Sequence, residues 1–265
     1  MSSTTEYDLG RLPEGLPVIV TGATGAIGTA ITRRLADEGV KVILAVRSEE
    51  KFRTLADMLK KRNPEANVEF LHLDLNDSSS VTEAVNALHG RQLAGVINNA
   101  GVMMRDFTLS PDGPETTLNV NFFNTRLFNL LLLPQVAQGG GMVFTTSLTR
   151  LAGRRHNLPT SVSAETFGQL KTYALSKKLI TRFAAEFAPV AAREGVNVNC
   201  ADPGVVDSDM ISMHRWYDPL ANIFFRPFIR RPAKGAIPAL RALASDRRGL
   251  IFTLRRSFPI NDFGE

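Results

Sequence analysis

A glycine-rich turn between an apolar run and a helical pattern constrains the fold of this chain more than any other feature. The apolar run covers residues 16–20, the turn carries Gly22, Gly25 and Gly28, and the helical pattern covers 26–38. Glycine lets the backbone turn tightly, and a helix start presents unpaired N–H groups and the positive end of the helix dipole. Such a turn can simply close a loop, but a strand before it and a helix after it predict a phosphate site for a dinucleotide.

Short apolar runs alternate with longer helical patterns along the rest of the chain. This alternation predicts one α/β domain over residues 1–265, a doubly wound parallel sheet of the Rossmann type with helices on both faces. The expected strands are 18–21, 41–46, 68–73, 94–98, 142–147 and 196–201, and the expected helices are 26–38, 49–62, 78–89, 113–135 and 165–193. The segment 207–231 has no regular period, and we expect it to form a substrate lid beyond the carboxyl end of a late strand.

Composition excludes several classes of protein. With 44% hydrophobic and 22% charged residues, the chain has ordinary globular usage. Its single cysteine, Cys200, allows no internal disulfide and fits a reducing compartment. No apolar run is long enough to cross a bilayer, so we expect a cytoplasmic protein. The net charge of +5 comes without a nucleic-acid-binding motif, and His156 and His214 lack the spacing of metal ligands, so we expect neither nucleic acid nor metal.

A tyrosine and a lysine four residues apart, Tyr173 and Lys177, would share one face of a helix. The chain has three tyrosines, and only this one is followed by lysine at the fourth position. The ammonium group is expected to lower the pKa of the phenol, which is ordinarily about 10. Tyr173 could then give a proton to a carbonyl oxygen or take one from an alcohol. In isolation, a surface aromatic beside a lysine would look the same.

Motifs spread from Thr21 to Gly204 give this pair a context. They are the glycine turn, Asp74-Leu75, Asn98-Asn99-Ala100-Gly101, Asn121, Ser147, Tyr173 with Lys177, and Pro203-Gly204. In this order and spacing the chain resembles the short-chain dehydrogenase/reductase family. Its Val46-Arg47 pair and the long gap between Ser147 and Tyr173 resemble the group of retinol dehydrogenases and protochlorophyllide reductases.

The resemblance implies a role for each member of a catalytic set of four residues. Tyr173 would be the acid and base, and Ser147 would hydrogen-bond the substrate oxygen and stabilise charge that develops there. Lys177 would also hold the nicotinamide ribose. Asn121 would hold a water that links Lys177 to solvent, although a kink in its helix is the plainer interpretation of this asparagine.

The resemblance also implies a cofactor-binding set at the carboxyl ends of the strands. Asp74 would hold the adenine amino group, or cap the next helix, or both. Asn98 would tie strands together and line the adenosine channel, and the Pro203-Gly204 pair would shape the nicotinamide pocket. The full set is Gly22, Thr24, Gly25, Ala26, Ile27, Gly28, Arg47, Asp74, Leu75, Asn98, Ala100, Gly101, Tyr173, Lys177, Pro203, Gly204 and Val206.

The end of the second strand distinguishes the two nicotinamide cofactors. An acidic residue there binds the ribose 2′-hydroxyl of NAD, whereas arginine accommodates the 2′-phosphate of NADP. In this chain Val46 stands at the acidic position and Arg47 follows it. Arginine can meet a phosphate with a bidentate fork, although a solvated strand end would also carry one. We therefore predict NADP(H) rather than NAD as the cofactor.

Together these observations predict an oxidoreductase that transfers hydride between NADP(H) and a carbonyl or alcohol. The residues expected to line the pocket are apolar on balance and favour a bulky, apolar small-molecule substrate, which the sequence does not name; they are Met103, Met104, Leu148, Thr149 and the segment 207–231. The glycines form TGxxGxxG, a spacing that resembles the extended branch of sugar-nucleotide epimerases and dehydratases, so that activity is one alternative. A non-catalytic NADP-binding regulator is a second alternative, and the intact catalytic set argues against it.

Two further features stay open at this point. The segment 210–231 interleaves aromatic residues with arginines, so it is either a lid packed on the core or a lid that also rests on a membrane surface. Members of the family commonly form homodimers or homotetramers through the helices that correspond to 113–135 and 165–193, although monomers exist.

Overall fold

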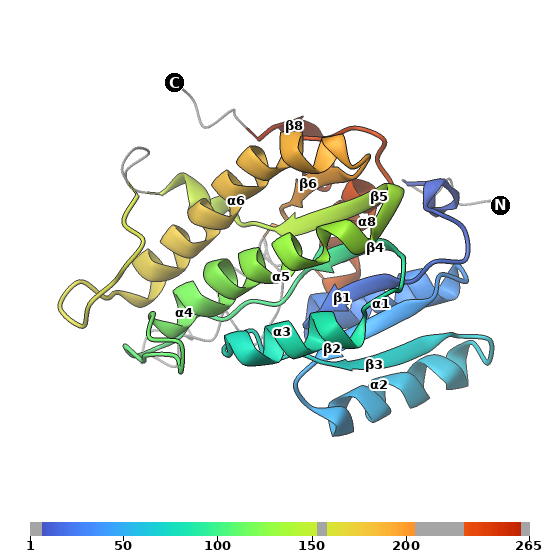
Figure 1. Ribbon diagram of the computed structural model, residues 1–265, viewed down its shortest axis with the longest axis horizontal. Helices are drawn as coiled ribbons and strands as arrows, with labels where there is room; N and C mark the ends of the chain where they lie inside the picture. Colours follow the sequence, from blue (N-terminus) through green and yellow to red (C-terminus); the bar gives the residue numbers. More distant parts are fainter. Residues whose placement is uncertain (1–6, 153–157, 205–230, 261–265) are drawn as a thin grey trace.

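An eight-stranded sheet forms the centre of the protein in the computed structural model, which describes residues 7–152, 158–204 and 231–260 (Figure 1). The strands lie in the order β3-β2-β1-β4-β5-β6-β7-β8. Every neighbouring pair is parallel except β7 with β8, which is antiparallel. Because the order reverses direction between β1 and β4, this sheet is the doubly wound, Rossmann-like sheet that the sequence predicts.

The strands are β1 (Val18–Thr21), β2 (Val42–Val46), β3 (Val68–His72), β4 (Leu93–Asn98), β5 (Val136–Thr145), β6 (Asn197–Ala201), β7 (Leu250–Phe252) and β8 (Ser257–Pro259). The first, second and fourth are buried along their whole length, as expected for parallel strands covered on both faces. The predicted strand 142–147 differs most, because β5 begins six residues earlier and ends before Ser147. Its early part contains three consecutive glycines, which weaken a strand pattern in the sequence.

Two layers of helices cover the sheet. The structure contains α1 (Ala26–Asp37), α2 (Glu49–Arg62), α3 (Ser78–Ala87), α4 (Thr116–Leu118), α5 (Asn124–Leu132), α6 (Gln169–Arg193) and α8 (Pro232–Leu243). Short 3₁₀ turns are η1 (Leu9–Arg11), η3 (Leu133–Gln135) and η4 (Leu148–Leu151), and η2 (Asn119–Phe123) is a π-helical turn. Helices α1, α2 and α8 pack into one core, and α3, α5 and α6 pack into the other. Figure 1 shows α3, α5 and α6 of the second layer lying side by side over the sheet.

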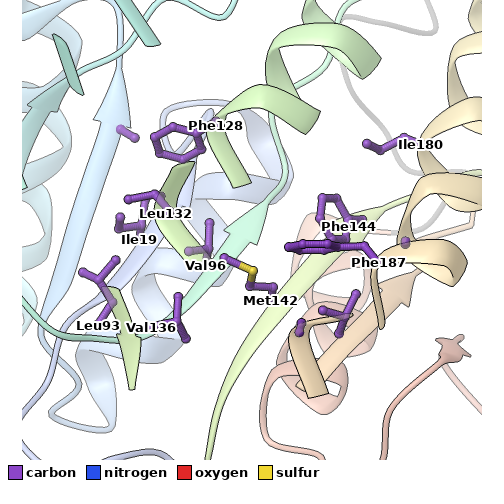
Figure 2. Close-up of a cluster of buried hydrophobic side chains, with 14 of the residues drawn as sticks. Ile19, Leu93, Val96, Phe128, Leu132, Val136, Met142, Phe144, Ile180 and Phe187 are labelled. Carbon is purple, nitrogen blue, oxygen red and sulfur yellow. The ribbon is translucent and has the colours of Figure 1, made fainter. Parts of the chain in front are cut away.

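Alternate residues of each central strand enter opposite cores. Met142 and Phe144 of β5 lie in the core under α3, α5 and α6, whereas Val143 between them lies in the other core. Figure 2 shows Phe128 and Phe144 pointing into the first core from α5 and β5. Phe144 also meets Phe183 of α6 edge to face, with ring centroids 5.7 Å apart. This aromatic packing seats α5 and α6 on the sheet.

The prediction of one long helix over 113–135 is wrong. This segment is divided into α4, the π-helical η2, α5 and η3. Side-chain amides of Asn119 and Asn124 donate to the carboxylate of Asp112, which also accepts from Ser78. Burial raises the pKa of Asp112, but these hydrogen bonds outweigh it and lower the pKa to about 2. Asn121, for which a kink was the alternative interpretation, lies inside the π-helical turn, where the regular α-helical hydrogen-bond pattern is interrupted.

The C-terminal part adds elements for which the sequence analysis gave no expectation. Helix α8 contains Pro232, Gly235 and Pro238, which obscure a helical pattern, yet it packs closely on α1. The strands β7 and β8 then extend the sheet beyond β6. The helix predicted over 165–193 begins instead at Gln169, after Gly168.

The predicted lid 207–231 lies outside the described residues apart from its last residue. Among the helices that the structure describes, none combines the length and apolar character needed to span a bilayer.

Candidate active site

The glycine turn follows β1 and leads directly into α1. Gly22 has a φ of 60°, the left-handed region that favours glycine, and its N–H donates to Ala45 of β2. Gly25 is the N-cap of α1, and no side chain caps that end within the described residues. Gly25 and Ala26 are exposed there, with Thr24 and Ile27 partly exposed beside them. The helix start is therefore open to an external anion.

Close packing explains the remaining glycines of the turn. A Cβ on Gly28 would overlap the carbonyl oxygen of Gly22 and lie 2.9 Å from Nδ2 of Asn99, and a Cβ on Gly22 would lie 2.8 Å from Cα of Ala100. Asn99 donates from Nδ2 to the carbonyl oxygens of Thr21 and Gly22, both at 3.1 Å. The end of β4 thus holds the turn in place. This cradle, narrow at its base and open at the helix start, fits the pyrophosphate of a dinucleotide.

Arg47 and Asp74 lie at the ends of β2 and β3, one strand and two strands away from the turn. Arg47 is exposed, and its Nη1 lies 4.0 Å from Oδ1 of Asp74. Asp74 accepts from the backbone N–H of Asn76, while Asp77 caps α3. The prediction that Asp74 caps the next helix is therefore wrong, because Asp77 takes that place. Leu75, the next member of the predicted set, is buried in the core.

Asn98 has its side chain turned into the protein. It exchanges two hydrogen bonds with Asn129 of α5, at 2.8 and 2.7 Å, and donates to the carbonyl oxygen of Val143 on β5. The prediction that Asn98 ties strands together is confirmed by these bonds. These bonds engage the side-chain amide inside the protein. Any contact of Asn98 with a cofactor would therefore come from its backbone.

The predicted catalytic residues converge where the end of β5 meets the middle of α6. The hydroxyls of Thr146 and Thr181 are 2.6 Å apart, and Nζ of Lys177 donates to the carbonyl oxygen of Thr145 at 2.9 Å. These contacts bring Ser147, just after β5, next to Tyr173 of α6, close enough for the serine hydroxyl to lower the pKa of the phenol. Lys177 lies 5.7 Å from the centre of the Tyr173 ring.

Asn121 approaches the same place from η2. It donates to the hydroxyl of Ser176 and to the carbonyl oxygen of Val102, and it accepts from the Val102 N–H. A Cβ added to Gly101 would lie 3.2 Å from Oδ1 of Asn121 and 3.4 Å from Nζ of Lys177, so only a glycine leaves this junction open. The predicted role of Asn121 in holding a water stays a prediction.

Electrostatics around Tyr173 correct one expectation. Burial raises the pKa of Tyr173 to about 12, a hydrogen bond with Ser147 lowers it, and the charge of Asp202 raises it further. Burial also lowers the pKa of Lys177 to about 8. The expected lowering of the phenol pKa by Lys177 is therefore wrong for the protein alone. The ammonium group is buried and directed to a backbone carbonyl, and burial of the phenol dominates.

A buried ion pair behind Ser147 was missed by the sequence analysis. Nη1 of Arg150 lies 2.6 Å from Oδ2 of Asp202, and Oδ1 of Asp202 accepts from the N–H of Gly204 at 2.9 Å. Arg150 and Asp202 are 52 residues apart, so no local pattern links them. Pro203 is buried next to this pair, and Val206 lies outside the described residues.

Comparison with known proteins places the chain in a family. The model of the short chain dehydrogenase family matches residues 17–216. Polyprenol dehydrogenase of Mus musculus is 30% identical over 241 residues, covering 87% of this chain and 72% of that protein. Retinol dehydrogenase 12 of Mus musculus is 32% identical over 242 residues, covering 88% and 74%. The chain belongs to the short-chain dehydrogenase/reductase family of oxidoreductases, in the group that resembles the retinol dehydrogenases.

Solved structures agree with this assignment at the level of the fold. A short chain dehydrogenase from Burkholderia cenocepacia in complex with NADP has a TM-score of 0.72 and 22% identity, covering 92% of this chain and 97% of that chain. A short chain dehydrogenase from Salmonella enterica has a TM-score of 0.71 and 24% identity, covering 91% and 96%.

Two glycine substitutions separate the architecture of the turn from its predicted ligand contact. Gly28→Ala should destabilise the protein by about 1–3 kcal/mol or more, because its Cβ overlaps backbone atoms. Gly25→Ala should leave thermal stability unchanged, because its φ of −74° suits any residue and its Cβ meets only the Gly22 carbonyl oxygen at 3.4 Å. The new methyl group should nevertheless weaken NADPH binding in a fluorescence titration. If Gly25→Ala bound NADPH with wild-type affinity, the cofactor phosphate would not bind at this turn.

Proposed function

We propose that the protein is an NADP(H)-dependent reductase and dehydrogenase of a bulky, apolar carbonyl or alcohol. The observation that carries this proposal is the contact between Ser147 and Tyr173, with Lys177 on the same face of α6 as the tyrosine. The two hydroxyl groups meet where a single oxygen atom of a substrate could contact both. When bound, the cofactor supplies or accepts the hydride at the carbon that carries this oxygen.

The protonation states suit proton donation by the tyrosine. With a pKa of about 12, Tyr173 keeps its proton at neutral pH and can give it to a carbonyl oxygen as charge develops there. Ser147 can donate a second hydrogen bond to the same oxygen. Lys177, with a pKa of about 8, is mostly protonated at pH 7 and so keeps donors for a ribose hydroxyl. Asn121 stays in its predicted role of holding a water that connects Lys177 to solvent.

Arg47 is the basis for proposing NADP rather than NAD. Its guanidinium is exposed at the end of β2, and the strand ends in Val46 instead of an acidic residue. The distance of 4.0 Å to Asp74 leaves the guanidinium free to turn toward a 2′-phosphate. The complex of the Burkholderia cenocepacia relative with NADP is consistent with this choice.

The apolar surroundings of Ser147 support a bulky apolar substrate. Leu148 and Leu151 of η4 are each 54% exposed and follow Ser147 closely in the chain, so they offer apolar surface beside it. Met103 and Met104, after β4, are half-buried, and we assign them to the same substrate pocket. The names of the curated relatives, polyprenol dehydrogenase and retinol dehydrogenase, indicate substrates of the same physical kind.

The glycine spacing TGxxGxxG keeps one alternative, a sugar-nucleotide epimerase or dehydratase. Such an enzyme returns the hydride to its own substrate and therefore retains its cofactor. Purified protein that carries tightly bound NAD, and shows no net oxidation of added NADPH, would favour the alternative over the proposal.

The central test of the proposal is Tyr173→Phe, which keeps the ring and its packing but removes the proton donor. Turnover of an aldehyde selected from a panel of apolar carbonyls should fall by a factor on the order of 100 or more. NADPH affinity should change little, because Lys177 and the glycine turn remain.

The matched control is Tyr7→Phe, which removes the hydroxyl of a tyrosine on the other core. It should keep wild-type turnover. Near wild-type turnover in Tyr173→Phe as well would contradict the proposed mechanism.

Replacement of Arg47 tests the choice of cofactor. Arg47→Ala should weaken NADPH binding by roughly 10- to 100-fold, because a charged hydrogen-bonded contact contributes about 1.5–3 kcal/mol. NADH affinity should stay nearly unchanged, because NADH lacks the 2′-phosphate. Arg53→Ala is the control, since Arg53 is an exposed arginine of α2 paired with Glu49. Equal losses for both cofactors in Arg47→Ala would reject the assignment.

A further inference from the structure

The ion pair between Arg150 and Asp202 differs from every other ion pair among the described residues. Its side chains are 3% and 2% exposed, whereas in each of the other pairs both side chains are at least 26% exposed. Removing two charges from water costs several kcal/mol per ion, and apolar replacements of a buried pair are often neutral or stabilising. The pair therefore needs an explanation other than stability.

The packing around the pair also indicates a role other than stability. Nε of Arg150 is buried without a hydrogen-bond partner in the described part of the chain, and its guanidinium lies 5.9 Å from the centre of the Phe258 ring. A buried donor without a partner costs stability. Among the described residues, Nη1 of Arg150 donates to two particular acceptors.

Those acceptors connect the two sides of the candidate active site. Nη1 of Arg150 donates to the backbone carbonyl oxygen of Ser147 at 2.8 Å as well as to Oδ2 of Asp202. The other oxygen of Asp202 accepts from the N–H of Gly204, which has a φ of 73°. One chain of contacts thus runs from the serine after β5 to the Pro203-Gly204 turn after β6.

The charge of Asp202 also reaches the acid–base pair. It raises the pKa of Tyr173 and the pKa of Lys177, so the carboxylate lies within electrostatic range of both groups. Arg150 provides the opposite charge next to it. The pair is therefore part of the surroundings of the reacting groups.

We propose that Arg150 and Asp202 are positioning residues that fix Ser147 and the Pro203-Gly204 turn relative to each other. This inference rests on the proposed function, in which Ser147 contacts the substrate oxygen and the turn borders the nicotinamide. Because the pair holds both backbones, it fixes the distance and orientation between the substrate oxygen and the nicotinamide ring. Small misplacement at a reacting centre lowers the rate far more than it changes stability.

The double variant Arg150→Met/Asp202→Leu tests the proposal, because it removes the clamp without leaving a buried charge unpaired. We expect a melting temperature within a few degrees of the wild type and NADPH affinity within about threefold. We also expect kcat for the apolar aldehyde to fall by about tenfold or more. Amide hydrogen exchange should become faster in residues 146–151 and at Asp202 and Gly204, the two residues of the turn that carry an amide hydrogen, and stay unchanged in β4.

The control is Arg182→Met/Glu186→Leu, which removes an exposed ion pair from α6, the helix that carries Tyr173. This control should keep wild-type kcat and wild-type exchange. A folded Arg150→Met/Asp202→Leu protein with wild-type kcat would overturn the proposal, and so would unchanged exchange in the two segments.

Two further outcomes are distinguishable. If the wild type turns over no carbonyl, the proposed function fails, and the exchange rates alone then decide whether the pair fixes the two backbones. If the double variant does not fold, Arg150→Gln/Asp202→Asn is measured in its place, because it removes both charges together and keeps two polar side chains of similar size. The same readings support or overturn the proposal in that variant.

Discussion

The contact between the end of β5 and the middle of α6 is the interaction on which the candidate active site depends. The Thr146 and Thr181 hydroxyls meet at 2.6 Å, and Lys177 donates to the carbonyl oxygen of Thr145. The two hydroxyls are buried and the Lys177 bond is partly buried, so each group would carry a desolvation penalty without its partner. The contact therefore fixes the height of α6 along the sheet. Because tyrosine precedes lysine by one helical turn, this height places the phenol of Tyr173 against Ser147.

A second constraint operates on the other half of the sheet, where β1, the glycine turn and the end of β4 are held together. Asn99 bonds the carbonyl oxygens of Thr21 and Gly22, and the absence of a side chain on Gly28 lets α1 approach the turn. Between this cradle and the serine–tyrosine contact lie the carboxyl ends of β1, β4 and β5, which are neighbours in the sheet. A dinucleotide extended along this edge would reach from the phosphate site to the phenol. In the proposed function, the fold separates the site that binds the cofactor from the site that moves the proton, and the sheet sets the distance between them.

Local signals were predictable from the sequence, and contacts distant in sequence were not. The turn before α1 and the four-residue spacing of Tyr173 and Lys177 depend on neighbours in the chain, so strand and helix patterns suffice to place them. The π-helical turn at Asn121 is flanked by Asn119 and Asn124, which both donate to Asp112, and no hydrophobic periodicity records such side-chain contacts. The Arg150–Asp202 pair depends on the adjacency of β5 and β6 in the sheet. The pKa of Tyr173 depends on burial, whose effect exceeds that of the lysine one helical turn away. Helix α8 was not predicted, because its prolines and glycine obscure the helical pattern.

Transfer of deuterium tests the central claim most directly. NADPH carrying deuterium at C4 of the nicotinamide, mixed with an apolar aldehyde, should yield an alcohol with deuterium on the carbinol carbon, detected by mass spectrometry. The same label should be almost absent from the product of Tyr173→Phe within the same time, although that variant still binds NADPH. An epimerase would transfer no deuterium from added NADPH to the alcohol or to any other released product. A regulator would bind NADPH but transfer no deuterium. Binding of NADPH with no label in the alcohol, across a panel of apolar aldehydes and ketones, would contradict the account.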